Sequence, residues 1–156
     1  MAPVGSDDAR LLILGSLPGD ASLAAQRYYA HPTNQFWRLL GAAIREELAG
    51  LDHDARLARL AARRIALWDV LADAVREGSL DTAIRDARAN PLAAFVTSHP
   101  KLRAIAFNGK TAATIGRRLI AGTSMTLIDL PSSSAAFTRK FDDKLRDWAA
   151  LGDFAG

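Results

Sequence analysis

The sequence contains no cysteine among its 156 residues. Disulfides, thiolate metal sites, iron–sulfur clusters and cysteine nucleophiles are therefore excluded. No apolar run approaches the roughly 20 residues that a membrane-spanning helix requires. Residues 1–10 also lack the basic and apolar segments that are typical of a secretory signal. We therefore expect a soluble cytoplasmic protein.

The length fits a single domain, residues 1–156, which can bury a core without covalent cross-links. Its positive charge is unevenly distributed. Between His99 and Arg146 there are nine Lys and Arg residues against three Asp, a local charge of +6. A polyanionic partner would explain this basic segment, and so would a set of solvated helix faces.

Four short apolar runs are typical of strands that are buried on both faces: Leu11–Leu14, Ile65–Trp68, Ala104–Phe107 and Met125–Ile128. Helices are predicted between and after them: a short one ending at Arg27, one carrying Phe36 to Ile44, Asp54–Arg63, Leu80–Arg88 capped by Ser79, one after Asn90-Pro91, Lys110–Ile120, and a last one capped by Thr138. This alternation predicts an α/β fold, a three-layer α/β/α sandwich with a central four-stranded parallel sheet.

Ligands of such folds bind at the carboxyl ends of the strands. Functional residues are therefore expected in the four loops that follow the strands, Gly15–Ser22, Asp69–Ser79, Asn108–Lys110 and Pro131–Phe137. The third loop imitates the end of a phosphate-binding P-loop, but Ala104 occupies the position where that motif requires a glycine. ATP or GTP hydrolysis is excluded. Lys110 could hold one phosphate of a longer polyanion or simply begin an exposed helix.

The stretch from Gly15 to Trp37 concentrates turn residues, aromatics and polar side chains. Tyr28 and Tyr29 offer flat faces for a nucleobase. Asn34 could present its amide to a water or to a base edge, or could cap the following helix. The Ser132–Ser134 triplet offers hydroxyl and N–H groups to phosphate oxygens, although a plain polar turn would look the same. The three histidines lie far apart, and no metal site is expected.

Two motifs resemble the uracil-DNA glycosylase superfamily. The first is Gly15-Ser16-Leu17-Pro18-Gly19 followed by Tyr29-Ala30-His31-Pro32-Thr33-Asn34-Gln35-Phe36-Trp37, and the second is Leu130-Pro131-Ser132-Ser133-Ser134. The most similar branches are the hypoxanthine-DNA glycosylases, with Gly-Ser-x-Pro and Leu-Pro-Ser, and the mismatch-specific uracil/thymine glycosylases. The resemblance covers essentially the whole chain.

The resemblance implies hydrolysis of the N-glycosidic bond of a damaged base that is flipped out of DNA. It implies no cofactor, double-stranded or single-stranded DNA as the partner, and a monomer. Tyr29 falls where the family stacks an aromatic ring on the base, and the backbone of Ser16 and Leu17 falls where it contacts the base edge. Base contacts are expected from Gly15, Ser16, Leu17, Pro18, Tyr29 and Asn108, and DNA contacts from Gly19, Lys110, Pro131, Ser132, Ser133, Ser134, Phe137 and Arg139.

Leu17 departs from the mismatch-specific branch, in which this position holds a water-activating Asn. In the hypoxanthine branch that role belongs to an Asn further along the chain, here Asn34. The resemblance therefore assigns catalysis to Asn34 and the chain to that branch, with hypoxanthine, uracil or xanthine as the base. Ala135-Ala136-Phe137 departs from the family pattern as well, and Phe137 is a candidate wedge into the minor groove.

Three alternatives remain open. Leu17 is compatible with a catalytically weak DNA- or nucleotide-binding module on the same fold. A hydrolase of free nucleosides would use the same chemistry, but it would have no use for the basic segment. A lyase acting through Lys110 is disfavoured, because nothing in the sequence desolvates that lysine to lower its pKa.

Overall fold

Four parallel strands form the centre of the structure, a computed structural model that describes residues 1–75 and 85–156. They are β1 (Leu11–Gly15), β2 (Ile65–Asp69), β5 (Ala104–Asn108) and β6 (Thr126–Leu130), in the order β2-β1-β5-β6. Every residue of β1, β2 and β5 is buried, as their continuous apolar runs require. The predicted four-stranded parallel sheet is confirmed, with the last strand beginning one residue later and ending two residues later than expected.

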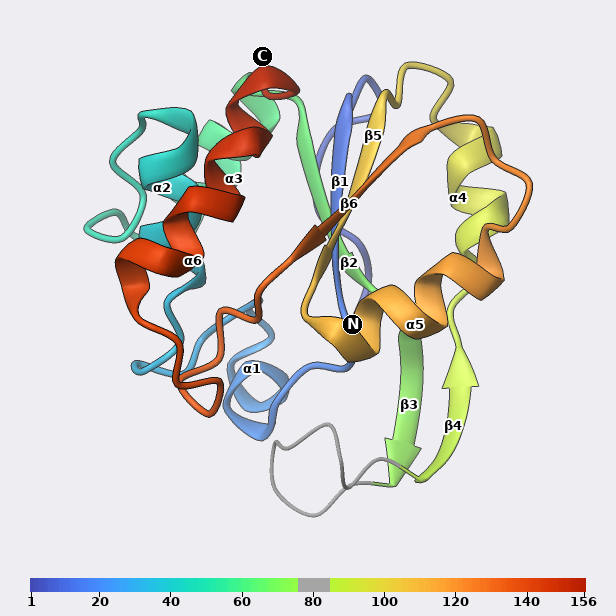
Figure 1. The fold of residues 1–156 in the computed structure, drawn as a ribbon, viewed down its shortest axis with the longest axis horizontal. Helices are drawn as coiled ribbons and strands as arrows, with labels where there is room; N and C mark the ends of the chain where they lie inside the picture. The colour runs from blue at the N-terminus through green and yellow to red at the C-terminus, as the bar shows by residue number, and fades with distance from the viewer. Residues whose placement is uncertain (76–84) are drawn as a thin grey trace.

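Helices cover both faces of the sheet (Figure 1). On one side lie α2 (Phe36–Ile44), α3 (His53–Ala62) and α6 (Phe141–Trp148), and on the other lie α4 (Leu92–Ser98) and α5 (Lys110–Leu119). A short α1 (Asp20–Ala25) lies beyond the carboxyl ends of the strands, and a 3-10 helix, η2 (Ala149–Asp153), follows α6. The three-layer arrangement is therefore confirmed. No helix in the described ranges is long and apolar enough to cross a membrane.

The amino-terminal segment covers the outer edge of the sheet. Val4 and Leu67 form an antiparallel bridge in which each backbone N–H donates to the other residue's carbonyl, at 3.0 and 2.9 Å. The indole Nε1 of Trp68 donates to the carbonyl of Met1 at 3.0 Å. These contacts explain why β2 is fully buried although it is an edge strand of the sheet.

A separate antiparallel hairpin extends past the carboxyl ends of the sheet, and it was not predicted. It pairs β3 (Leu71–Val75) with β4 (Arg85–Ala89). The predicted helix Leu80–Arg88 is wrong where it overlaps β4, and its first residues and the Ser79 cap lie outside the described residues. Alanine and arginine favour helices locally, but cross-strand pairing, which includes an ion pair between Arg88 and Asp73, overrides that preference.

Other predicted helix boundaries differ from the structure by a few residues: α3 lies one residue earlier than Asp54–Arg63, and α5 ends at Leu119 rather than at Ile120. Helix α1 ends at Ala25 rather than at Arg27, because Gln26 adopts a left-handed conformation with φ of 53°. Helix α6 begins at Phe141 after Lys140, without a side-chain cap, so Thr138 does not cap it. None of these differences moves the strands or the loops that follow them.

Candidate active site

A pocket of about 560 Å³ lies at the carboxyl ends of the strands. The loops after β1, β5 and β6 meet there, as predicted for this type of sheet. Its lining is Gly15, Ser16, Leu17, Pro18, Gly19, Ala21, Ser22, Tyr28, Tyr29, His31, Thr33, Asn34, Asp69, Asn108, Ser132, Ser133, Ser134, Ala135, Ala136 and Phe137. Of the predicted site residues, only Lys110, Pro131 and Arg139 do not line it.

A chain of hydrogen bonds joins three loops across the floor of this pocket. The buried amide Nδ2 of Asn108 donates to Ser133 Oγ at 2.8 Å, and the backbone N–H of Ser133 donates to Asn108 Oδ1 at 2.9 Å. Ser133 Oγ then donates to Asn34 Oδ1 at 2.8 Å. Asn108 and Ser133 therefore fix the orientation of the Asn34 amide through these hydrogen bonds.

Asn34 is also fixed by the helix that follows it. Its Oδ1 accepts a second hydrogen bond, from the backbone N–H of Phe36, the first residue of α2, at 3.0 Å. Both acceptor positions of Oδ1 are thus occupied. No acceptor for Asn34 Nδ2 lies among residues 1–75 and 85–156. Gln35 rather than Asn34 is the N-cap of α2, and its side chain makes no cap hydrogen bond. The Asn34 amide thus uses its oxygen within the protein and offers its two N–H groups to the pocket that it lines.

Tyr29 forms one wall of the pocket. Its ring stacks on Phe36, with centroids 3.8 Å apart and planes inclined by 11°. Its φ of 54° is left-handed, a conformation that is costly for a tyrosine and that is concentrated at functional sites. The fully buried Phe36 backs one face of the ring, and the ring borders the pocket where a flat base could stack.

Asp69 lines the same pocket and was given no role by the sequence analysis. It is the last residue of β2, is only 3% exposed, and lies opposite Gly15 in the register of β1 and β2. Asn90 supports this turn, because its Nδ2 donates to the Asp69 carbonyl at 2.8 Å. The one sequence signal that could have identified Asp69 was its position at the end of a predicted buried strand.

Gly15 makes room for the Asp69 carboxylate. A Cβ atom at Gly15 would lie 2.6 Å from Asp69 Oδ1 and 3.0 Å from the Tyr29 hydroxyl oxygen. Burial raises the pKa of the Tyr28 hydroxyl, and the nearby negative charge of Asp69 raises it further. The carboxylate thus lies among the two tyrosines and the first-motif glycine.

Replacing Gly15 by alanine is expected to displace the Asp69 carboxylate, since the new methyl group cannot coexist with it. A displacement of about 1 Å at a reacting centre can cost about 10²-fold in rate. We therefore expect Gly15→Ala to lower base excision by about 10- to 100-fold. Gly122→Ala is the control, since a Cβ there meets no atom within 4 Å, although its φ of 89° adds some strain. Equal rates for the two variants would contradict this prediction.

The outer rim of the pocket carries an exposed aromatic ring between two cations. Phe137 is 40% exposed, with the Arg139 guanidinium 5.2 Å and the Lys144 ammonium 5.4 Å from its centroid. Arg139 lies beside the pocket rather than in it, and it also pairs with Asp147 at 3.1 Å. The Pro131 carbonyl accepts a hydrogen bond from Trp148 Nε1 at 2.9 Å, which anchors the start of the rim loop. Lys110 is exposed at the start of α5.

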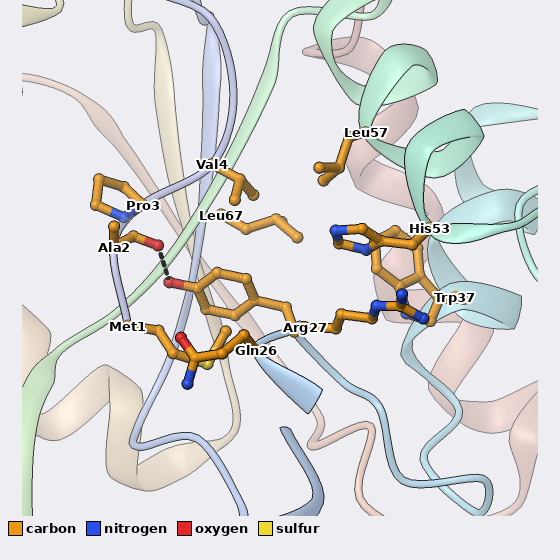
Figure 2. A pocket seen from close by; sticks show the side chains of 11 residues that line it. Met1, Ala2, Pro3, Val4, Gln26, Arg27, Trp37, His53, Leu57 and Leu67 are labelled. Carbon is orange, nitrogen blue, oxygen red and sulfur yellow. Dashed lines mark hydrogen bonds between the residues drawn. The ribbon is translucent and has the colours of Figure 1, made fainter. Parts of the chain in front are cut away.

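Tyr28 also lines a second, smaller cavity of about 180 Å³, which Figure 2 shows from close by. Residues of the amino-terminal segment, of β2 and of α3 line it, among them Val4, Leu67 and His53. The Tyr28 hydroxyl donates to the Ala2 carbonyl at 2.7 Å. Tyr28 therefore separates the two cavities rather than presenting a free face to a base.

In the described ranges, no three His, Asp or Glu side chains gather as metal ligands.

Comparisons with known proteins find relatives that match nearly the whole chain. Two curated hypoxanthine DNA glycosylases are each 41% identical to the chain. The one from Methanosarcina barkeri aligns over 147 residues, 94% of this chain and 92% of the relative. The one from Methanosarcina acetivorans aligns over 145 residues, 93% of this chain and 91% of the relative.

A solution NMR structure from Methanosarcina acetivorans, assigned provisionally as a uracil DNA glycosylase, has the same fold. It superposes with a TM-score of 0.87 at 40% identity, over 97% of this chain and 93% of its own. The sequence model of the uracil DNA glycosylase superfamily matches residues 2–152. The chain therefore belongs to the uracil DNA glycosylase superfamily.

Proposed function

We propose that this protein is a monofunctional DNA glycosylase that removes a deaminated base, above all hypoxanthine, from DNA. The observation that carries the proposal is the hydrogen-bonded chain from Asn108 through Ser133 to Asn34, which aims the Asn34 N–H groups into a pocket walled by Tyr29. The 41% identity to proteins described as hypoxanthine DNA glycosylases supports the same base. We also propose that the chain acts as a single-domain monomer on DNA in the cytoplasm.

The Asp69 carboxylate favours hypoxanthine and uracil over adenine and cytosine, the amino bases from which deamination produces them. Hypoxanthine, uracil and xanthine share a ring N–H on the Watson–Crick edge, whereas adenine and cytosine have an unprotonated ring nitrogen there. An ionised carboxylate accepts a hydrogen bond from a ring N–H. It is repelled by the lone pair of an unprotonated ring nitrogen. A site built to accept a hydrogen bond rejects a substrate that cannot donate it, because buried polar groups are then left unpaired.

Asn34 acts on the reaction through its nitrogen. Cleavage of the glycosidic bond passes through an oxocarbenium-like transition state, which needs a positioned water more than a strong base. The Asn34 Oδ1 already accepts hydrogen bonds from Ser133 and Phe36, so it is not a free base for the water. We infer that the Asn34 Nδ2 donates to the oxygen of the attacking water and holds it in place.

The basic segment and the rim loop would hold the DNA. Exposed cations bind phosphates, and the Ser132–Ser134 loop offers polar groups beside the pocket. Phe137 stands at the rim as an apolar side chain that can enter the space left by a flipped base.

Replacing Phe137 by alanine is expected to weaken binding to a lesion-containing duplex by about tenfold, the size of one lost stacking contact. The measurement is fluorescence anisotropy with a labelled duplex. Leu23→Ala is the control, because Leu23 is the other exposed large apolar side chain of the described residues and does not line the pocket. If both variants bind as the wild type does, Phe137 is not the wedge.

A panel of duplexes, each with a single hypoxanthine, uracil or xanthine, tests the proposed function. Heating in alkali converts each abasic product into a strand break, and we expect breaks at hypoxanthine above all. Tight lesion-selective binding without base release would instead identify a binding module. Trapping of a covalent adduct by borohydride would replace the monofunctional mechanism with a lyase. A single-stranded inosine substrate shows whether a duplex is required.

A further inference from the structure

Lys144, on the inner face of α6, is a fully buried lysine. Its ammonium donates to Gln35 Oε1 at 2.9 Å and to the carbonyl of Ser134 at 3.1 Å. It also lies 5.4 Å from the centroid of the Phe137 ring. The ammonium thus donates to two oxygen acceptors, and its charge also lies within cation–π range of an aromatic face.

Burying this charge is costly, and no carboxylate offsets the cost. None of the ion pairs among residues 1–75 and 85–156 includes Lys144. Burial lowers the pKa of its ammonium, and the positive charge of Arg139 lowers it further. An apolar residue would fill the same space at less cost, which indicates that the hydrogen bonds themselves are required.

These hydrogen bonds join the two segments that hold Asn34. Gln35 follows Asn34 directly, and its backbone N–H donates to the Ser133 carbonyl at 2.9 Å. Ser134 follows Ser133, whose hydroxyl donates to Asn34 Oδ1. Lys144 therefore donates hydrogen bonds to the neighbour of each partner in the Asn34–Ser133 pair rather than to the partners themselves.

We propose that Lys144 is a positioning residue of the glycosylase, which fixes loop 131–137 against the start of α2 so that Ser133 holds the Asn34 amide in its working orientation. The inference rests on the proposed function. Lys144 does not line the pocket and belongs to neither sequence motif.

Single-turnover excision of hypoxanthine from a duplex tests this proposal. We expect Lys144→Met to lower the rate at saturating enzyme by about 10- to 100-fold, since small displacements of a positioned group cost that much. Arg45→Met, which removes a positive charge from an exposed position outside the basic segment, is expected to stay within about twofold of the wild type. Gln35→Met keeps Lys144 and removes one acceptor, and we expect a smaller loss in the same direction.

A double-variant cycle separates positioning from general destabilisation. If Lys144 acts through Asn34, Asn34→Ala combined with Lys144→Met is expected to be about as slow as Asn34→Ala alone. Wild-type rates in folded Lys144→Met and Gln35→Met, or fully additive losses in the cycle, would overturn the proposal. If Lys144→Met does not fold, the excision rates of Gln35→Met and of its double variant with Asn34→Ala test the proposal instead. A wild-type protein that is inactive on every lesion would overturn the proposed function as well.

Discussion

Asn34→Ala is expected to slow hypoxanthine excision by about 10²- to 10⁴-fold, the range for a group that positions or activates the attacking water. The structure supplies the reason, because the Asn34 amide is held by Ser133 and Phe36 with its N–H groups directed to the pocket. Single-turnover rates with one inosine duplex measure the effect without a contribution from product release.

Asn34→Asp is the matched control, because aspartate keeps an oxygen that can accept from Ser133 and from the Phe36 N–H, and puts a carboxylate oxygen in place of the NH₂ group. It is expected to melt near the wild-type temperature and yet to be about as slow as Asn34→Ala. Asn34→Ala also loses the two hydrogen bonds that Oδ1 accepts, each worth about 0.5–1.5 kcal/mol in the free energy of unfolding. A wild-type rate for Asn34→Asp would move the role from the nitrogen to the oxygen.

Asp69→Ala is expected to slow hypoxanthine excision by about 10- to 150-fold, the equivalent of a lost hydrogen bond to a charged group. The selectivity is expected to change with it. Without the carboxylate, the ring N–H of hypoxanthine loses its acceptor and the unprotonated nitrogen of adenine loses its repulsion. The ratio of the excision rates of hypoxanthine and adenine therefore falls.

Asp69→Asn separates the acceptor from the charge. Its amide oxygen can still accept from the ring N–H, so hypoxanthine excision is expected to stay within about tenfold of the wild type. Asp73→Ala, an exposed aspartate on β3, is expected to leave the rates unchanged. If Asp69→Asn is as slow as Asp69→Ala, then the negative charge rather than the acceptor is what the reaction uses.

The sheet and most of the pocket were predictable because their signals are local. Continuous apolar runs mark buried strands, and the ends of parallel strands must share one edge. The hairpin of β3 and β4 was not predictable, since Arg85–Ala89 has the composition of a helix and pairs with distant residues. Roles for Asp69 and Lys144 could not be predicted for a related reason. Their importance comes from burial among residues that are far away in the chain.

The close approach of Gly15 to Asp69 has an evolutionary consequence. The two residues lie side by side on neighbouring strands, and any side chain at the first would occupy the space of the second. A lineage cannot enlarge one without shrinking or turning the other. We therefore expect the two positions to covary across the superfamily, so that a larger residue at the position of Gly15 accompanies a smaller or reoriented one at the position of Asp69.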